Sequence, residues 1–217
     1  MDQHRAGCAP DSTARQINMP VSSKVEIQAL LTELTGGDDS RAENSIPAIL
    51  ELGMAVMPAL LDLTRAEEAD FRWWAVRALA ASPHTRTEDL LPLLSDSAPE
   101  VRAAAALALC EHPHESAIEA LIKTLADEDS LTAGLAGNAL VKIGNPSVPS
   151  LLNVMNDSPI GIRTRCVALR ALSEIRDHRA IPVMMKSLSD ESALIQYWAK
   201  EGLERLGLDM VYILPGA

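Results

Sequence analysis

The chain has 217 residues, of which 30 are Asp or Glu and 19 are Lys or Arg, so its formal net charge at pH 7 is −11. This charge argues against a nucleic-acid or membrane partner, because a phosphate backbone and an anionic lipid surface both bind clustered Lys and Arg. Hydrophobic residues make up 47% of the chain and aromatic residues only 3%. That composition favours an aliphatic, alanine-rich core of closely packed helices over a sheet.

The N-terminal residues are polar and show no helical period, so we expect residues 1–22 to form a disordered leader. They lack the apolar segment of a secretory signal, and the three widely spaced cysteines indicate no disulfide framework. Together these features favour a cytoplasmic location. A helix is expected from Ser23, because Ser23 and Glu26 form a capping-box pattern. Gly36 and Gly37 are expected to end that helix.

The clearest structural unit spans residues 97–127 and is predicted to be two short helices joined by a turn. In the helix expected from Pro99 to about Glu111, and in the one from about Ser116 to Ala126, apolar residues recur at spacings of three and four. This spacing places them on one face of each helix. A helical pair of this size cannot bury both of its faces alone, so it needs neighbours of the same shape.

The same unit recurs about every 30 residues, in two registers that agree along the chain. The second helices begin their apolar pattern at Ile27, Met57, Thr87, Ile118, Val148 and Ile181. The first helices each carry a large aliphatic residue, called the anchor below, at Ile49, Leu79, Leu109, Leu140, Leu172 and Leu203. We therefore predict an all-α, right-handed α-α superhelix over residues 23–206, with about 12 helices in antiparallel pairs. An apolar C-terminal tail follows at residues 207–217.

Charged residues repeat in step with the anchors. Arginines stand seven residues before three anchors, and aspartates close four second helices: Arg72, Arg102 and Arg165, with Asp96, Asp127, Asp157 and Asp190. This arrangement predicts a ladder of Arg–Asp pairs between successive repeats, each worth about 0.5 kcal/mol if exposed. Pro47 lies inside the first full pair, and we expect it to kink that helix or to move its start to about Ser45.

Several motifs indicate the type of repeat: VRAAAALAL, ALVKIG, GLERLG and AIPVMMKSLSD. On these motifs, the chain resembles HEAT-repeat proteins of the short-repeat, phycobilisome-lyase-like (PBS lyase HEAT-like) subgroup, over about residues 24–207. The resemblance implies a HEAT-like solenoid and, as an alternative function, a bilin lyase-like or chaperone-like role. A DNA glycosylase of similar fold is a further alternative, which the acidic charge disfavours.

No metal site, cofactor or catalytic residue is predicted. Deoxyhypusine hydroxylase resembles the chain in architecture and holds iron with His–Glu pairs on its first helices, but the comparable positions here carry no such pair. His84, His114 and His178 fall in nearly the same turn of three repeats, where an exposed histidine near a helix C-terminus is the ordinary interpretation. A metal site at His112 and His114 is the less favoured alternative.

The few aromatic residues gather in two first helices, with Trp73 and Trp74 in one and Tyr197 and Trp198 in the other. Two interpretations stay open for them. The rings fill space in an alanine-lined layer near each end of the array, or they form exposed contact patches of the kind found at binding hot spots. The two clusters lie four repeats apart, so they cannot form one pocket.

The working surface is expected on the inner, concave face, where HEAT-like solenoids expose their second helices. The outward positions there form a row that is acidic early and gains lysine later: Asp62, Glu88, Glu119, Lys123, Asn153 and Lys186. Because the repeat lattice is complete and no catalytic groups converge in the sequence, we predict a non-enzymatic protein-protein interaction or scaffold module. This row would then hold a protein partner or a subunit of a complex.

Overall fold

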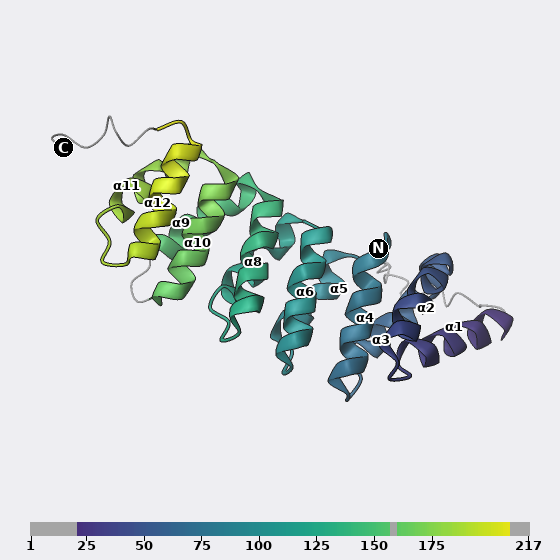
Figure 1. The fold of residues 1–217 in the computed structure, drawn as a ribbon. Coiled ribbons are helices and arrows are strands. Elements are labelled where there is room, and N and C mark those ends of the chain that lie inside the picture. Colours follow the sequence, from purple (N-terminus) through teal and green to yellow (C-terminus); the bar gives the residue numbers. More distant parts are fainter. Residues whose placement is uncertain (1–20, 157–159, 209–217) are drawn as a thin grey trace, which may run out of the picture.

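The computed structural model describes residues 21–156 and 160–208, and these residues form the predicted all-α solenoid (Figure 1). Within them the chain makes twelve α-helices and no strand. Nearly all of the predicted leader at residues 1–22, and residues 209–217 of the predicted tail, lie outside the described residues. The first helix begins at Val21, slightly ahead of the expected start at Ser23.

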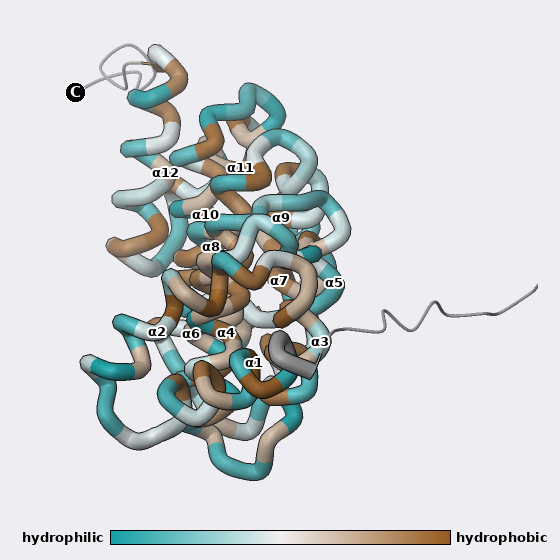
Figure 2. The backbone as a smooth tube through the Cα atoms, turned by 90° about the vertical axis from the view of Figure 1, so that its right-hand side faces the viewer, coloured by the Kyte–Doolittle hydropathy of each residue, from teal (hydrophilic) through white to brown (hydrophobic). Residues whose placement is uncertain are grey.

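The helices alternate between two layers, which Figure 2 shows from the end of the array. The first helices form one layer: α2 (Asp39–Glu51), α4 (Ala69–Ala81), α6 (Pro99–Glu111), α8 (Ser130–Ile143), α10 (Ile162–Ile175) and α12 (Ala193–Arg205). The second helices form the other: α1 (Val21–Leu34), α3 (Met57–Leu63), α5 (Thr87–Leu90), α7 (Ile118–Thr124), α9 (Val148–Asn156) and α11 (Ile181–Ser187). Short 3₁₀ turns precede α3, α7, α9 and α11.

The core lies between the two layers and is built from the predicted registers. All six anchors, from Ile49 to Leu203, are fully buried. The alanines four residues before the later anchors are fully buried as well: Ala75, Ala105, Ala136, Ala168 and Ala199. Each buried leucine contributes about 1.5–3 kcal/mol through removal of its side chain from water, while the alanines let neighbouring first helices approach closely.

The closest approach between first helices involves Gly137 of α8. A Cβ atom at this position would lie 2.6 Å from Cγ1 of Val167 on α10. Real Cβ atoms do not come this close to a neighbour, so the observed packing of α8 against α10 requires glycine. Gly134, one turn earlier in the same helix, has open space where its Cβ would stand.

Two prolines shape the N-terminal half in different ways. Of the two effects expected of Pro47, a kink or a later start at about Ser45, the later start is wrong, because α2 already begins at Asp39 and holds Pro47 inside it. The Asp38 side chain caps it by accepting a hydrogen bond from the backbone N–H of Arg41, at 3.0 Å. Pro92, by contrast, interrupts the second helix of its repeat, so α5 is short and continues as the 3₁₀ helix η2 (Leu91–Ser95).

The structure confirms the predicted Arg–Asp ladder at three repeats. Arg72 donates to both carboxylate oxygens of Asp96 at 2.7 Å, Arg102 binds Asp127 in the same way at 2.8 and 2.9 Å, and Arg165 pairs with Asp190. The Arg102 and Asp127 side chains are only 9% and 10% exposed. The three pairs are therefore more sheltered than exposed surface pairs, for which the value of about 0.5 kcal/mol holds. Asp157, the remaining predicted member, lies outside the described residues.

Across residues 21–156 and 160–208, no single helix is long and apolar enough to cross a membrane. The segments Asp39–Glu51 and Gly53–Leu63 meet the length and composition criteria only as a pair, and they are bent by 114°.

Candidate functional site

The surface formed by α3, α5, α7, α9 and α11, called the second-helix face below, carries the six residues predicted to bind a partner. Asp62, Glu88, Glu119, Lys123, Asn153 and Lys186 are all exposed. They lie on five successive second helices, so the structure places them in a row rather than in one cluster. Two of them carry side-chain contacts to neighbours: Asp62 accepts from Arg65 at 3.4 Å, and Glu88 accepts from Ser116 at 3.5 Å.

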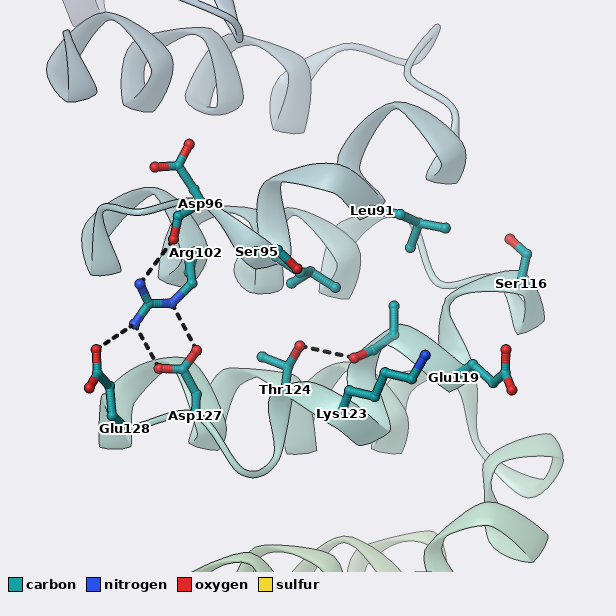
Figure 3. A pocket seen from close by; sticks show the side chains of 12 residues that line it. Leu91, Ser95, Asp96, Arg102, Ser116, Glu119, Lys123, Thr124, Asp127 and Glu128 are labelled. Carbon is teal, nitrogen blue, oxygen red and sulfur yellow. Dashed lines mark hydrogen bonds and ion pairs between the residues drawn. The ribbon is translucent and has the colours of Figure 1, made fainter. Parts of the chain in front are cut away.

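A groove of about 730 Å³ lies on this face between η2 and α7, and it brings Glu119 and Lys123 together (Figure 3). Leu91 and Ser95 line it from η2. The Arg102–Asp127 pair lines the end of the groove where the two repeats join (Figure 3). The groove is therefore half apolar and half polar, with its charged groups concentrated at the repeat junction and along α7.

The charges at the repeat junction are largely committed to the fold. The Arg72 guanidinium holds the pKa of the Asp96 carboxyl below its usual value through a direct hydrogen bond. Burial works to raise the pKa of the Asp127 carboxyl, but hydrogen bonds from Arg102 and from the backbone outweigh it and lower that pKa. The exposed charged groups of the groove are Glu119, Lys123 and Glu128. Glu128 lies 3.7 Å from Arg102, so Glu119 and Lys123 are the groups best positioned to meet a partner.

The turn histidines are structural or exposed. His84, His114 and His178 are exposed, and His114 Nδ1 lies 2.9 Å from the Ser116 hydroxyl oxygen. His112 Nε2 lies 2.9 Å from the carbonyl oxygen of Ala80, which ties its turn to α4. Among the described residues, no group of three or more His, Cys, Asp or Glu side chains is arranged to hold a metal ion.

The two cysteines on the first helices are poorly suited to nucleophilic chemistry. Burial is the main cause that raises the pKa of the Cys110 thiol, and it raises the pKa of the Cys166 thiol in the same way. A thiol with a raised pKa carries little of the thiolate that acts as nucleophile. Both side chains pack within the helix layer, Cys110 in part and Cys166 fully.

The aromatic clusters divide between the two interpretations. Trp74 is only 4% exposed and belongs to the core, whereas Tyr197 is 55% exposed. Trp73 and Trp198 are half-buried. In each cluster the rings meet edge to face, with centroids 4.8 Å apart for Trp73 and Trp74 and 5.1 Å apart for Tyr197 and Trp198. Each cluster therefore has one better-buried ring and one that reaches the surface.

One surface feature is missing from the sequence predictions. Leu107 on α6 and Leu131 on α8 are 51% and 61% exposed on the first-helix side. A signal for Leu107 was present in the repeat register. Two residues before their anchors, the other first helices from α4 onward carry Arg77, Asn138, Arg170 and Glu201, so a leucine there departs from a polar position.

Comparison with known proteins gives two matches to repeat families. Residues 87–165 match HEAT repeats, and residues 164–190 match the PBS lyase HEAT-like repeat. In fold, the chain is similar to the complex of CpcE and CpcF of phycocyanin lyase from Nostoc sp. PCC7120, with a TM-score of 0.53 at 22% identity. That likeness covers 68% of this chain and 98% of the other.

Two curated proteins are similar in sequence. A phycobilisome maturation protein of Synechococcus elongatus is 33% identical over 107 residues, which is 49% of this chain and 50% of that protein. The bilin biosynthesis protein RpcF of a Synechococcus species is 32% identical over 101 residues, or 46% and 47% of the two chains. The chain thus spans about half the length of the curated relatives that it matches.

These relatives overturn one prediction. From the sequence we expected a non-enzymatic protein, and the names of the relatives, together with the phycocyanin lyase complex, contradict that expectation. The prediction rested on the lack of converging catalytic residues in the sequence. The repeat matches and the fold agree with the predicted architecture: residues 87–165 match HEAT repeats, residues 164–190 match the PBS lyase HEAT-like repeat, and the described residues form an all-α solenoid.

Proposed function

We propose that this protein is a bilin lyase-type component of phycobilisome maturation, which holds a phycobiliprotein partner on its second-helix face in the cytoplasm. The observation that carries the proposal is the sequence identity of 33% and 32% to two proteins named for phycobilisome maturation and bilin biosynthesis. This identity extends over about half of the chain, which is more than a single repeat, so it reflects more than one shared structural motif.

The geometry supports a holding role. The exposed row from Asp62 to Lys186 runs along five second helices, and the groove at Glu119 and Lys123 offers apolar walls beside opposite charges. An extended surface of this kind suits a folded protein better than a small molecule, which favours an enclosed pocket. A protein that brings a pigment and its acceptor together accelerates their union by raising their effective concentration, without a catalytic side chain of its own.

The direct test is pigment attachment in a bacterial host that makes a bilin and a phycocyanin subunit. The host is compared with and without the full chain, and each comparison is made both with and without a second HEAT-repeat chain from the same genome. Covalently bound bilin is measured by the absorbance of the purified, denatured phycocyanin subunit. We expect more bound bilin when this chain is present. Equal bilin in its presence and absence, with the chain folded and abundant, would refute the proposal.

The role of the second-helix face is tested separately by charge reversal. Glu88→Lys, Glu119→Lys and Lys123→Glu, combined in one protein, should weaken binding of the phycocyanin subunit and lower pigment attachment. Glu67→Lys, a reversal at an exposed residue in the loop before α4, is the matched control and should leave both unchanged. If pigment attachment stays high with the triple reversal, the activity belongs to another surface.

A further inference from the structure

The first-helix side of the molecule carries a second groove that the proposed function does not use. One part, of about 650 Å³, is mainly apolar and lies over α4, α6 and α8, which stand side by side in Figure 1. Another part, of about 540 Å³, lies over α2 and α4. Trp73 and Glu100 line both parts. We call the two together the first-helix groove.

The apolar part is lined by small residues of α6 and by large aliphatic ones. Ala103 and Ala104 of α6 line it together with Trp73, Leu107 and Leu131, and the exposed Glu111 also borders it. These two leucines leave more than half of their area in water. A cluster of this kind over three adjacent helices differs from singly scattered surface leucines, and contiguous apolar patches mark interaction sites in soluble proteins.

The other part is acidic and aromatic. Asp39, Asp70 and Glu100 line it beside the Trp73–Trp74 pair. These three carboxylates form no ion pair with any other described residue. All three lie in the first turns of α2, α4 and α6, where a negative charge stabilises the N-terminus of a helix. That stabilisation does not explain why the three carboxylates line one groove beside a tryptophan pair. Carboxylates beside indole rings form a favourable setting for a Lys or Arg side chain.

The repeat register gives the groove a direction. Nine residues before the anchor, α4 carries Asp70, α6 carries Glu100 and α8 carries Leu131. The same edge of the helix layer therefore changes from acidic to aliphatic along the array. Arg77, the one basic residue lining the described groove, is held by Glu43 at 2.6 Å, so it does not offset the acidic end.

We propose that the first-helix groove binds an amphipathic segment of a partner protein, with aliphatic side chains over α6 and α8 and a Lys or Arg over Trp73, Asp70 and Glu100. The groove and such a segment are complementary, because apolar lining residues select aliphatic side chains and unpaired carboxylates beside indole rings select a cation. Adjacent first helices are spaced by about 10 Å, so the part of the groove from α4 to α8 fits a segment of about four helical turns.

The test begins with the full chain and a phage-displayed library of random peptides about 15 residues long, enough for about four helical turns. We expect the enriched peptides to combine aliphatic residues at helical spacing with Lys or Arg near one end. An enriched peptide is then synthesised with a fluorescent label, and its affinity is measured by fluorescence anisotropy. Enrichment of acidic peptides, or of no sequence at all, would overturn the proposal.

Variants locate the binding site. Trp73→Ala and Leu107→Gln should each weaken the peptide by about tenfold or more, as truncation of a hot-spot residue does. Leu194→Gln is the matched control for Leu107→Gln, because Leu194 on α12 is 53% exposed and lies outside the groove. It should leave the affinity unchanged, as should Glu119→Lys on the opposite face. Equal affinity for all these variants would place binding elsewhere.

Charge exchange tests the orientation of the segment. Glu100→Lys should weaken the selected peptide and strengthen a peptide in which its basic residue is replaced by Glu. A structural defect in the variant would weaken both peptides, so the crossed result distinguishes a direct contact from damage to the fold. The affinity of the wild-type protein should also fall as salt is raised, because exposed charge pairs are screened. Salt-independent binding with no crossed effect would refute the predicted cation contact.

Discussion

Arg102 ties two successive repeats together, and its replacement by methionine gives a sharp test of the ladder. The guanidinium donates two hydrogen bonds to Asp127, at 2.8 and 2.9 Å, and one to the backbone carbonyl of Asp96 at 3.0 Å. Methionine keeps the apolar stem of the side chain but none of these donors. Arg102→Met therefore isolates the polar contacts from the packing.

The expected cost follows from burial. Hydrogen bonds to charged groups are each worth about 1.5–3 kcal/mol, and loss of one partner leaves the sheltered Asp127 carboxylate poorly solvated. Part of this loss is offset, since Asp127 also accepts a hydrogen bond from the Asp129 backbone at 2.9 Å and one side remains open to water. We expect Arg102→Met to lower the free energy of unfolding by about 3 kcal/mol, as measured for broken buried pairs.

The control is Arg77→Met. Arg77 donates to Glu43 at 2.6 Å, and the two side chains are 42% and 50% exposed, so both partners of this pair are open to water. We expect a cost of less than about 1 kcal/mol there. Both variants are compared with the wild-type chain by urea unfolding followed by circular dichroism, with linear extrapolation to water. If the two substitutions cost the same, burial is not what makes the ladder stabilising.

The remaining predictions concern glycine and pH. Gly134→Ala should raise the free energy of unfolding by about 0.5–1 kcal/mol, because alanine is the better helix former and the site is open, whereas Gly137→Ala should lower it through overpacking against α10; thermal unfolding of both variants checks the difference. Asp177 has its pKa lowered to about 2, chiefly by a hydrogen bond from Arg179. A carboxyl whose pKa is lower in the folded than in the unfolded protein stabilises the fold at pH values above its unfolded pKa, and this stabilisation is lost as the pH falls. The free energy of unfolding should therefore drop between about pH 4 and pH 2, and it should drop less steeply in Asp177→Asn. Parallel plots of this free energy against pH for the two proteins would contradict the prediction.

The fold was predictable because the repeat supplies the same information several times. Each anchor such as Leu109 is supported by an alanine one turn earlier and by a second-helix register that agrees with it. Local features were less secure. Pro47 suggested a late helix start, yet the cap by Asp38 fixes the start of α2 upstream. A proline signals a missing hydrogen bond, whereas the helix boundary depends on what satisfies the other backbone groups.

The candidate surfaces were only partly predictable. The outward row that includes Glu119 and Lys123 follows from helix periodicity, and all of its members are exposed. The groove beside these two residues depends on the distance between η2 and α7. Pro92 influences that distance, but it cannot be predicted from helix periodicity. The aromatic residues could not be assigned to the core or to the surface from the sequence. Adjacent helical residues such as Trp73 and Trp74 are rotated by about 100° from each other, so one can be buried while its neighbour reaches the surface.

The first-helix groove itself has a simple origin in the register of the repeats. Trp73 and Trp74 of α4 stand six and five residues before their anchor, and α6 carries Ala103 and Ala104 at the same two positions. A bulky pair beside a small pair on adjacent, closely packed helices leaves a step in the surface. Trp73 and the two alanines line the same part of the groove. The groove is thus a consequence of the bulky pair on α4 lying beside the small pair on α6.

If the groove arises in this way, a tryptophan on α6 at the register position that Trp74 occupies on α4 should close it. Ala104 is half-buried, so Ala104→Trp can place its ring in the groove at a helix-propensity cost of only about 0.5 kcal/mol. We expect the variant to fold normally and to bind the selected basic peptide about tenfold more weakly or worse. Ala120→Trp, which fills the groove at Glu119 and Lys123 instead, should leave peptide binding intact and lower pigment attachment. If Ala104→Trp binds the peptide as well as the wild-type chain does, the step between α4 and α6 is not the binding site.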